Sequence, residues 1–116
     1  MLVKVELNTE EICYHEPNPD DQWDSGSYGL MIHGVSVRKS DREYDSEFLG
    51  SVGDACVVLV EHYRDGDTFG DSEYAEIKGV FATMAEAEIV AKGINVDHGY
   101  FGHFIDFKYL EAIVKP

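Results

Sequence analysis

The sequence predicts an α+β domain, a mainly antiparallel β-sheet of about five strands with one covering helix at about residues 84–93. Several segments alternate apolar and polar residues with the period of two that is typical of strands. One segment instead has apolar residues at helical spacing, and strand-like segments precede and follow it. A helix in that position buries its apolar stripe on one face of the sheet. We expect residues 1–116 to form a single acidic domain, because this length is typical of one.

The first two strands are expected on either side of a loop. Apolar residues alternate with polar ones over residues 3–7, and this strand is expected to continue to Tyr14. Residues 16–27 gather prolines, glycine and acids into a loop. The second strand has its apolar face over residues 31–37, and we expect it to extend through residues 40–45.

The remaining strands are expected in the second half of the chain. The uninterrupted apolar run over residues 55–60 predicts a central strand that is covered on both faces. Residues 64–71 read as a loop, and residues 74–81 as the next strand. Residues 104–114 predict a long last strand, with a bulge near Leu110.

The helix has the clearest local signal. Thr83 and Glu86 form a capping box, in which the Thr hydroxyl accepts a backbone hydrogen bond and the Glu reaches back. The apolar residues at helical spacing are Met84, Ala87, Val90, Ala91 and Ile94. Gly93 is expected to supply a left-handed cap at the end of the helix.

The charge balance limits the kinds of partner. The chain has 23 acidic and nine basic residues, for a net charge of −14. Such a charge repels phosphate backbones and anionic membranes, so we expect neither direct nucleic-acid binding nor membrane binding. It favours a protein with a basic surface, including the grooves of nucleic-acid enzymes. The alternative interpretation is that the acids only keep the protein in solution.

The sequence also predicts a cytoplasmic location. Its first residues do not resemble a signal peptide, and the longest apolar run, residues 55–60, is too short to span a bilayer. Cys13 and Cys56 lie in apolar, strand-like settings, and we expect both to be reduced, buried thiols.

No pattern of residues reaches the specificity of a metal or catalytic site. Residues 65–76 nearly fit a calcium loop, but Phe69 stands where an oxygen ligand is needed, so a hairpin loop is the better interpretation. His98 and His103 are too few for a zinc site. We therefore expect no metal, no cofactor and no catalytic residue. The alternative is a small-ligand-binding protein or an enzyme that uses the loop at residues 62–70.

A row of acids suggests a surface for partner binding. Asp41, Glu43, Asp45 and Glu47 alternate with other residues. On an extended strand they would lie on one face at about 6.6 Å intervals, a spacing similar to that of a nucleic-acid backbone. The alternative is an edge strand that charge protects from aggregation. Phe69 either packs on the core or serves as an exposed anchor for the partner. The candidate partner-binding residues are Asp41, Glu43, Asp45, Glu47, Asp65, Asp67, Phe69 and Asp71.

Two short motifs resemble a family of small tailed-bacteriophage proteins. The run from Tyr63 to Gly70 resembles the family motif Tyr-x-x-Gly-Asp-Ser/Thr-Phe-Gly, and residues 99–101 are similar to a later Gly-Tyr-Phe element. The tryptophan associated with that later element is absent here. The resemblance implies a phage protein that acts inside a bacterium by inhibiting or modulating a host protein, for example one of defence or nucleic-acid processing. Nucleic-acid mimicry is one route for such inhibition. The resemblance implies no catalytic residues.

Overall fold

The computed structural model describes residues 1–65, 72–95 and 103–116. In chain order the elements are β1 (Leu2–His15), β2 (Ser27–Lys39), β3 (Ser46–Glu47), β4 (Ala55–Asp65), β5 (Ser72–Phe81), α1 (Met84–Asn95) and β6 (His103–Ile113).

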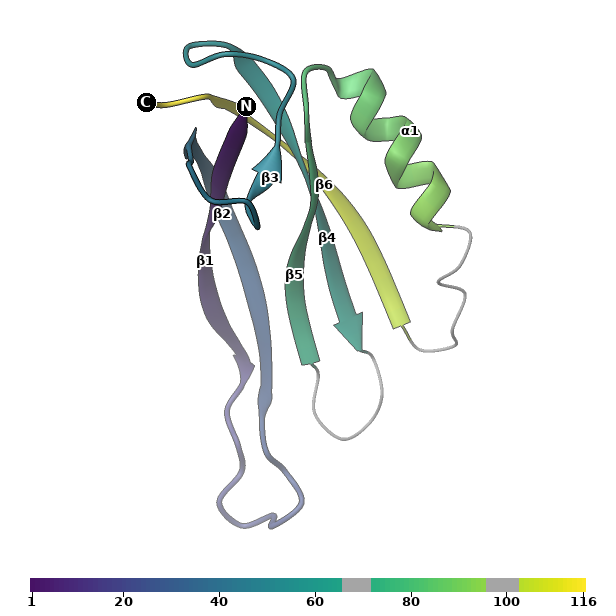
Figure 1. Ribbon diagram of the computed structural model, residues 1–116. Helices are drawn as coiled ribbons and strands as arrows, with labels where there is room; N and C mark the ends of the chain where they lie inside the picture. Colours follow the sequence, from purple (N-terminus) through teal and green to yellow (C-terminus); the bar gives the residue numbers. More distant parts are fainter. Residues whose placement is uncertain (66–71, 96–102) are drawn as a thin grey trace.

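The expected α+β architecture is confirmed, but the strands form two sheets. Sheet A has the order β2-β1-β3 and sheet B the order β5-β4-β6. Strand pairs within both sheets are antiparallel. Helix α1 covers one face of sheet B, and the long β1–β2 hairpin lies on the opposite side (Figure 1).

The core explains the apolar run in β4. Val58 and Val60 are fully buried in a cluster between the two sheets, together with Val3 and Val37. The alternate residues of β4 pack with buried Ala87 and Ala91 of α1. Because successive side chains of a strand point to opposite faces, a strand covered on both faces has to be apolar at every position.

Strand β2 ends earlier than expected. It stops at Lys39, and the prediction of a strand through residues 40–45 is wrong. The Asp45 amide donates to the Arg42 carbonyl oxygen at 3.2 Å, which closes a turn. The Ser40 hydroxyl donates to the Asp45 carboxylate. Short polar side chains of this kind offer the backbone a local alternative to a strand ladder.

The β-bulge of sheet B lies in β5, whereas the sequence predicts one in β6. Strands β4 and β6 pair without a register shift, so the bulge expected near Leu110 is wrong. The shift falls between Leu59 and Val60 of β4, where Lys78 is the extra residue of β5. Gly79 follows it, and a Cβ there would meet the ring of Phe81 at 2.7 Å.

Helix α1 begins as predicted but ends later. The Glu86 amide donates to Thr83 Oγ1 at 3.3 Å, which confirms the Thr83 cap. Gly93 lies inside the helix, and within the described residues only Gly26 and Gly53 have positive φ angles. The predicted left-handed cap at Gly93 is therefore wrong. Met84 is 37% exposed and contributes little to the helix–sheet contact.

The last residues connect the two sheets. The Lys115 amide donates to the Val37 carbonyl oxygen at 2.9 Å, and the Lys39 amide donates to Lys115 at 2.8 Å. The end of the chain thus leaves sheet B and pairs with the outer edge of β2. Over the residues described, no helix has the length and hydropathy needed to cross a membrane.

Candidate functional site: the acidic hairpin arm

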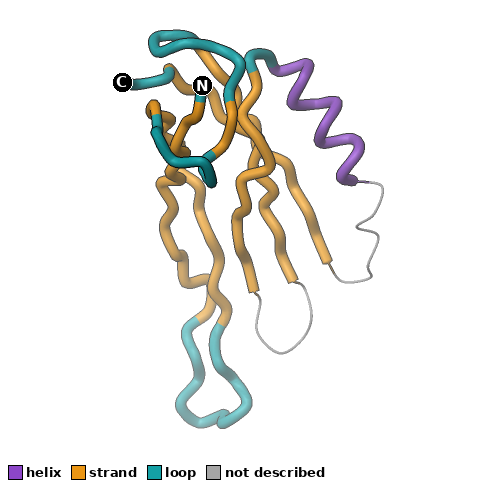
Figure 2. Tube along the Cα trace, in the orientation of Figure 1, coloured by secondary structure: helices purple, strands orange, loops and turns teal. Residues whose placement is uncertain are grey.

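The most prominent feature of the molecule is the projecting part of the β1–β2 hairpin. We call residues 9–33 the arm; they follow the bulge at which His33 is the extra residue of β2. The loop at its end lies well beyond the ends of β4 and β5 (Figure 2). The molecule measures 56 × 30 × 22 Å, and its radius of gyration is 17.0 Å, whereas a compact domain of this length has about 13 Å. The arm accounts for this elongation.

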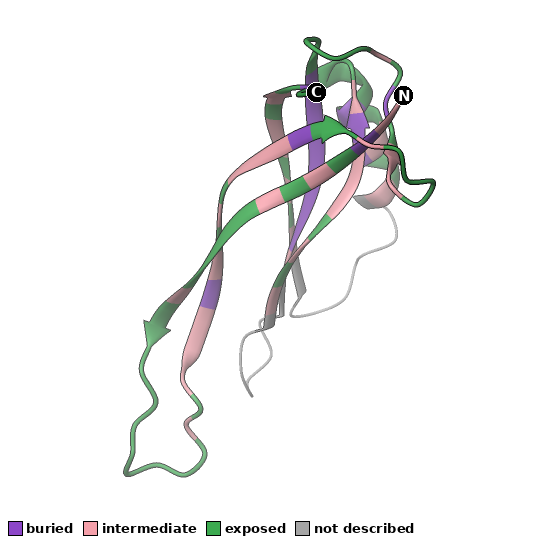
Figure 3. Ribbon diagram, turned by 60° about the vertical axis from the view of Figure 1, so that its left-hand side comes forward, coloured by how far each residue is buried: buried purple, intermediate pink, exposed green. Residues whose placement is uncertain are grey.

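The arm is strongly acidic. It carries six carboxylates and neither lysine nor arginine. Five of the six belong to exposed residues, and Asp24 is half-buried. Figure 3 shows that the surface of the arm is largely exposed towards its tip. The carboxylates are those of Glu10, Glu11, Glu16, Asp20, Asp21 and Asp24.

One carboxylate holds the tip of the arm together. Asp24 accepts hydrogen bonds from the Asn18 and Gly26 amides at 3.1 and 3.0 Å, and its Oδ2 lies 2.8 Å from His15 Nε2. The hydrogen bond with His15, followed by those from the two amides, lowers the pKa of Asp24 below its ordinary value. Gly26 has a φ of 85°, a conformation that favours glycine, so it can return the chain to β2. The tip is therefore closed by several local bonds at once.

Two further bonds shape the outermost turn. The Asp20 amide donates to Asn18 Oδ1, and the Trp23 amide donates to Asp21 Oδ1, both at 3.0 Å. Trp23 is 80% exposed and is the chain's single tryptophan. A large apolar side chain at a projecting tip, on a backbone held by hydrogen bonds, is typical of an anchor for another molecule.

A buried network fixes the root of the arm to sheet B. Glu73 Oε2 accepts from the Leu30 amide at 2.7 Å and lies 3.2 Å from His62 Nε2. The side chains of Glu73 and His62 are each 5% exposed. Because β2 contributes the amide and sheet B the two side chains, this network restrains the direction in which the arm projects.

Beside this network a cleft separates the arm from sheet B. Its volume is about 330 Å³. Its lining includes Ile12, Leu30 and Ile32 of the arm and His62, Lys108 and Leu110 of sheet B. His62 already contacts Glu73. Lys108 is therefore the charged side chain of the lining that a ligand in the cleft would meet.

A second buried ion pair lies on the other face of β4. Glu61 is 2% exposed, and its Oε2 lies 3.1 Å from Lys78 Nζ. That contact is not aligned as a hydrogen bond, and no other described group donates to this oxygen. A hydrogen bond from Lys78 to Glu76, with a contribution from Glu61, raises the pKa of Lys78. Lys78 therefore stays protonated, and its positive charge compensates the buried carboxylate of Glu61.

His62 and Tyr63 do not share a site. His62 faces sheet A and contacts Glu73, whereas the ring of Tyr63 stacks on Tyr74 with centroids 4.6 Å apart. Adjacent residues of a strand point to opposite faces. This separates two side chains that the small-ligand or enzyme interpretation of residues 62–70 would bring together.

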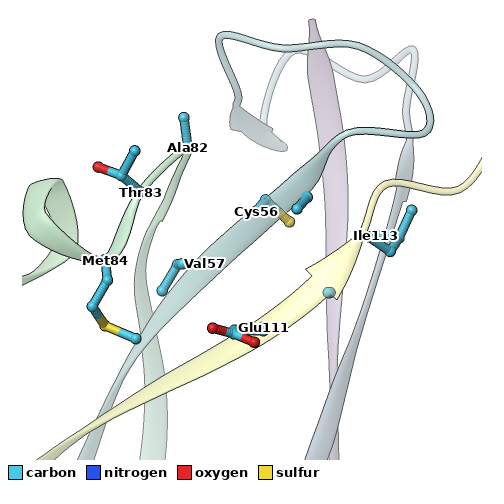
Figure 4. Close-up of a pocket in the computed structure, with 9 residues that line it drawn as sticks. Cys56, Val57, Ala82, Thr83, Met84, Glu111 and Ile113 are labelled. Atoms are coloured by element: carbon cyan, nitrogen blue, oxygen red, sulfur yellow. The ribbon is translucent and has the colours of Figure 1, made fainter.

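A groove of about 440 Å³ lies between the first turn of α1 and the neighbouring ends of β4 and β6. Met84, Val57 and Glu111 line it, and Cys56 lies at its side (Figure 4). Burial raises the pKa of the Cys56 thiol, which disfavours the nucleophilic thiolate. Cys56 is buried as expected, but Cys13 is exposed on the arm, so the prediction for Cys13 is wrong.

The predicted row of acids is not a row. Asp41 and Glu43 are exposed in the turn before β3, and Asp45 is half-buried against Ser40. Glu47 is exposed and belongs to the two-residue strand β3. The four side chains therefore lack the regular spacing of an extended strand, although they still gather in one short segment.

The other candidate residues lie at or beyond the limits of the description. Asp65 is the last residue of β4, and its side chain is outside the described part. Asp67, Phe69 and Asp71 lie outside the described residues, as does half of the calcium-like loop at residues 65–76. Elsewhere, within the parts described, no group of three or more His, Cys, Asp or Glu side chains is placed to hold a metal ion.

The sequence predicts a loop around Trp23 but no role for this residue. The available signal was a lone tryptophan among prolines and acids, a composition in which a large apolar residue is unusual. That it projects from a long arm depends on where sheet B ends, which no local pattern encodes.

No family model matches this chain, and neither a curated protein nor a solved structure matches it.

Proposed function

We propose that this chain is an acidic binding protein that docks its arm on a basic surface of a partner protein, with Trp23 as the anchor. The observation that supports this most directly is the exposed Trp23 on a hydrogen-bonded tip among carboxylates. The motif at residues 63–70 supplies the setting of the proposal, a phage protein that inhibits or modulates a host protein in the bacterial cytoplasm. Covering a basic groove would exclude the anionic ligand that the groove normally binds.

The tip supplies affinity because it is organised before binding. A tryptophan anchor that fills a pocket is worth about 2 kcal/mol or more, which corresponds to about 30-fold in Kd. Ordering a flexible loop at an interface would offset part of this gain. The bonds of Asp24 and Asp21 hold the backbone of the tip in the free protein, so little of that cost remains.

The charge of the arm supplies attraction and selectivity. Exposed carboxylates on a segment that contains neither lysine nor arginine produce a field that steers a cationic surface towards the tip. The same field repels anionic partners. This division of roles, charge for encounter and tryptophan for affinity, is common at protein interfaces.

The test is capture from bacterial lysate with the tagged chain as bait and quantitative mass spectrometry as the readout. Trp23→Ala should reduce recovery of the captured protein at least about tenfold, and the double variant Asp20→Lys with Asp21→Lys should do the same. The matched controls lie off the arm. Tyr44→Ala removes another exposed aromatic side chain, and Asp41→Lys with Glu43→Lys makes the same change of charge.

The controls should retain capture. If the Asp41 and Glu43 variant loses capture while both arm variants retain it, the acids at residues 41–47 are the working surface and the arm is not. If every variant recovers the same proteins as the parent chain, the proposal is wrong. Circular dichroism of each variant verifies that the fold is unchanged.

A further inference from the structure

Strand β1 has an open edge next to the root of the arm. On one side it pairs with β2 along its length. On the other side, among the residues that the structure describes, it pairs with β3 at Leu2 and Val3 alone. The outer edge of β2, by contrast, is occupied near its end by Lys115.

The hydrogen bonds show which backbone groups face this edge. The Ser40 amide donates to the Leu2 carbonyl oxygen, so even-numbered residues at the start of β1 direct their backbone groups to β2. The Phe48 amide donates to the Met1 carbonyl oxygen, so odd-numbered residues face β3. The same alternation points the amide and carbonyl groups of Val5 and Leu7 towards the edge that β3 leaves open.

The segment before β3 turns away from β1 and so ends the pairing of these two strands. Residues directly before Ser46 would pair with Val5 and Leu7 if β3 were longer. The turn closed between Arg42 and Asp45 prevents this. An extended segment from another molecule can therefore take the place that a longer β3 would occupy.

The side chains around the edge define the chemistry of that segment. Proteins commonly protect open edges with lysine or proline. β1 has no proline, and its one lysine, Lys4, is tied to Glu6 at 3.3 Å. Exposed Glu6, Glu10 and Glu11 leave the strand negative.

We infer that an extended, lysine- or arginine-bearing segment of the partner adds to this edge antiparallel to β1, in continuation of β3. The inference rests on the proposed function, since it names the part of a cationic partner that the root of the arm receives. β-Strand addition is an established mode of peptide recognition, in which main-chain bonds supply affinity and alternate side chains supply specificity.

The geometry dictates the pattern of that segment. Residues directly opposite one another in an antiparallel pair point to the same face. The residues opposite Val5 and Leu7 lie over the core side and should be apolar, and the residue between them lies beside Glu6 and should be cationic. A peptide Lys-Lys-Thr-Val-Lys-Val-Thr satisfies this pattern and directs its first lysines towards Glu10 and Glu11.

Backbone amide hydrogen exchange tests the inference with this peptide and the full chain. In the free protein the Val5 and Leu7 amides should exchange fast, and the Lys4 and Glu6 amides slowly. At a peptide concentration of about ten times Kd, exchange at Val5 and Leu7 should slow about tenfold. Lys4 and Glu6, whose amides already face β2, are the internal controls.

Two methylated peptides separate strand addition from charge attraction. N-methylation of both valines removes the amides that face β1 and should weaken binding, measured by fluorescence anisotropy, at least tenfold. N-methylation of the middle lysine removes an amide that faces solvent and should leave Kd within about threefold.

Equal binding of the two methylated peptides would overturn the inference, because charge alone would then account for binding. Absence of peptide binding, or of protection at Val5 and Leu7, would overturn it as well. Either result leaves the proposed function standing if capture still depends on Trp23. Loss of Trp23 dependence with retained protection would reject the anchor and keep the strand addition.

Discussion

At the scale of single residues, two carboxylates determine how the arm is held. Asp24 closes the tip through three contacts. Glu73 ties the root to sheet B. Around each of these carboxylates, hydrogen-bond donors of the protein take the place of water. Such charge-assisted hydrogen bonds are stronger than those between neutral groups.

The bonds of Asp24 make the tip sensitive to acid. Its pKa is lowered in the folded protein, so the contribution to stability is present above the pKa of an unfolded aspartate, about 4, and is lost as the pH falls through the lower folded value. We expect the Asn18 and Gly26 amide signals to shift with a midpoint below pH 4, measured by nuclear magnetic resonance. The transition should be absent in Asp24→Asn. A midpoint at or above 4 would contradict the network.

Glu73 should contribute more to stability than any exposed acid. Its side chain is 5% exposed, and its removal would leave the partly buried Leu30 amide and the buried His62 without this acceptor. Glu73→Ala should lower the free energy of unfolding by about 2–4 kcal/mol, measured with urea. Glu73→Gln keeps an oxygen acceptor and should cost less. Exposed Glu88→Ala is the control, with an expected change of about 0.5 kcal/mol. A loss below about 1 kcal/mol in Glu73→Ala would show that the network is not stabilising.

At the scale of elements, α1 illustrates how a local signal specifies one end of a helix better than the other. The Thr83 hydroxyl has a partner three residues away, and that bond needs no other part of the chain. The C-terminal end is decided differently. Packing of Ala87 and Ala91 on β4 continues the helix past Gly93, even though glycine is a poor helix former.

Gly93→Ala should therefore stabilise the protein. Gly93 is exposed inside α1, and a Cβ there would meet no atom within 4 Å. The free energy of unfolding should rise by about 0.5–1 kcal/mol, measured by thermal denaturation. Gly53→Ala is the contrasting variant, because its φ of 95° is strained for alanine and the change should destabilise. A loss of stability in Gly93→Ala would mean that the helix ends at this glycine after all.

At the scale of the whole molecule, shape and charge act together. An elongated molecule of net charge −14 places like charges far apart along a 56 Å axis. The arm extends beyond the ends of β4 and β5 (Figure 2), so it can carry acids there with less repulsion than a compact core could. The same arrangement presents those acids to a partner.

Salt should stabilise the protein. Raising the ionic strength from 0.01 to 0.15 M shortens the Debye length from about 30 to about 8 Å, which removes repulsion between distant carboxylates. We expect the free energy of unfolding, measured with urea, to rise over this range. The variant Asp20→Asn with Asp21→Asn should respond less, because two exposed charges of the tip are gone. A stability independent of salt would show that the surplus charge carries no cost.

Local patterns determined those features whose causes lie within a few residues. The alternation in β1 and β2, the apolar run in β4 and the Thr83 cap could all be read from neighbouring side chains. Tertiary structure decided the rest. Residues 40–45 alternate like a strand, but they turn because Ser40 and Asp45 bond to each other. The alternation in residues 27–39 predicts a strand, but it does not specify whether that strand joins the sheet of β4 or a separate sheet.

What the sequence alone determined is therefore the class of fold, the position of most elements and the acidity of the surface. Only the tertiary structure decided that the strands divide into two sheets, that Glu73 and His62 meet the Leu30 amide, and that Trp23 stands at the end of an arm. Each of these depends on contacts between residues far apart in the chain, and such contacts are chosen by the packing of whole faces. The periodicity of a strand specifies which side is apolar, but it does not specify which other surface will cover that side.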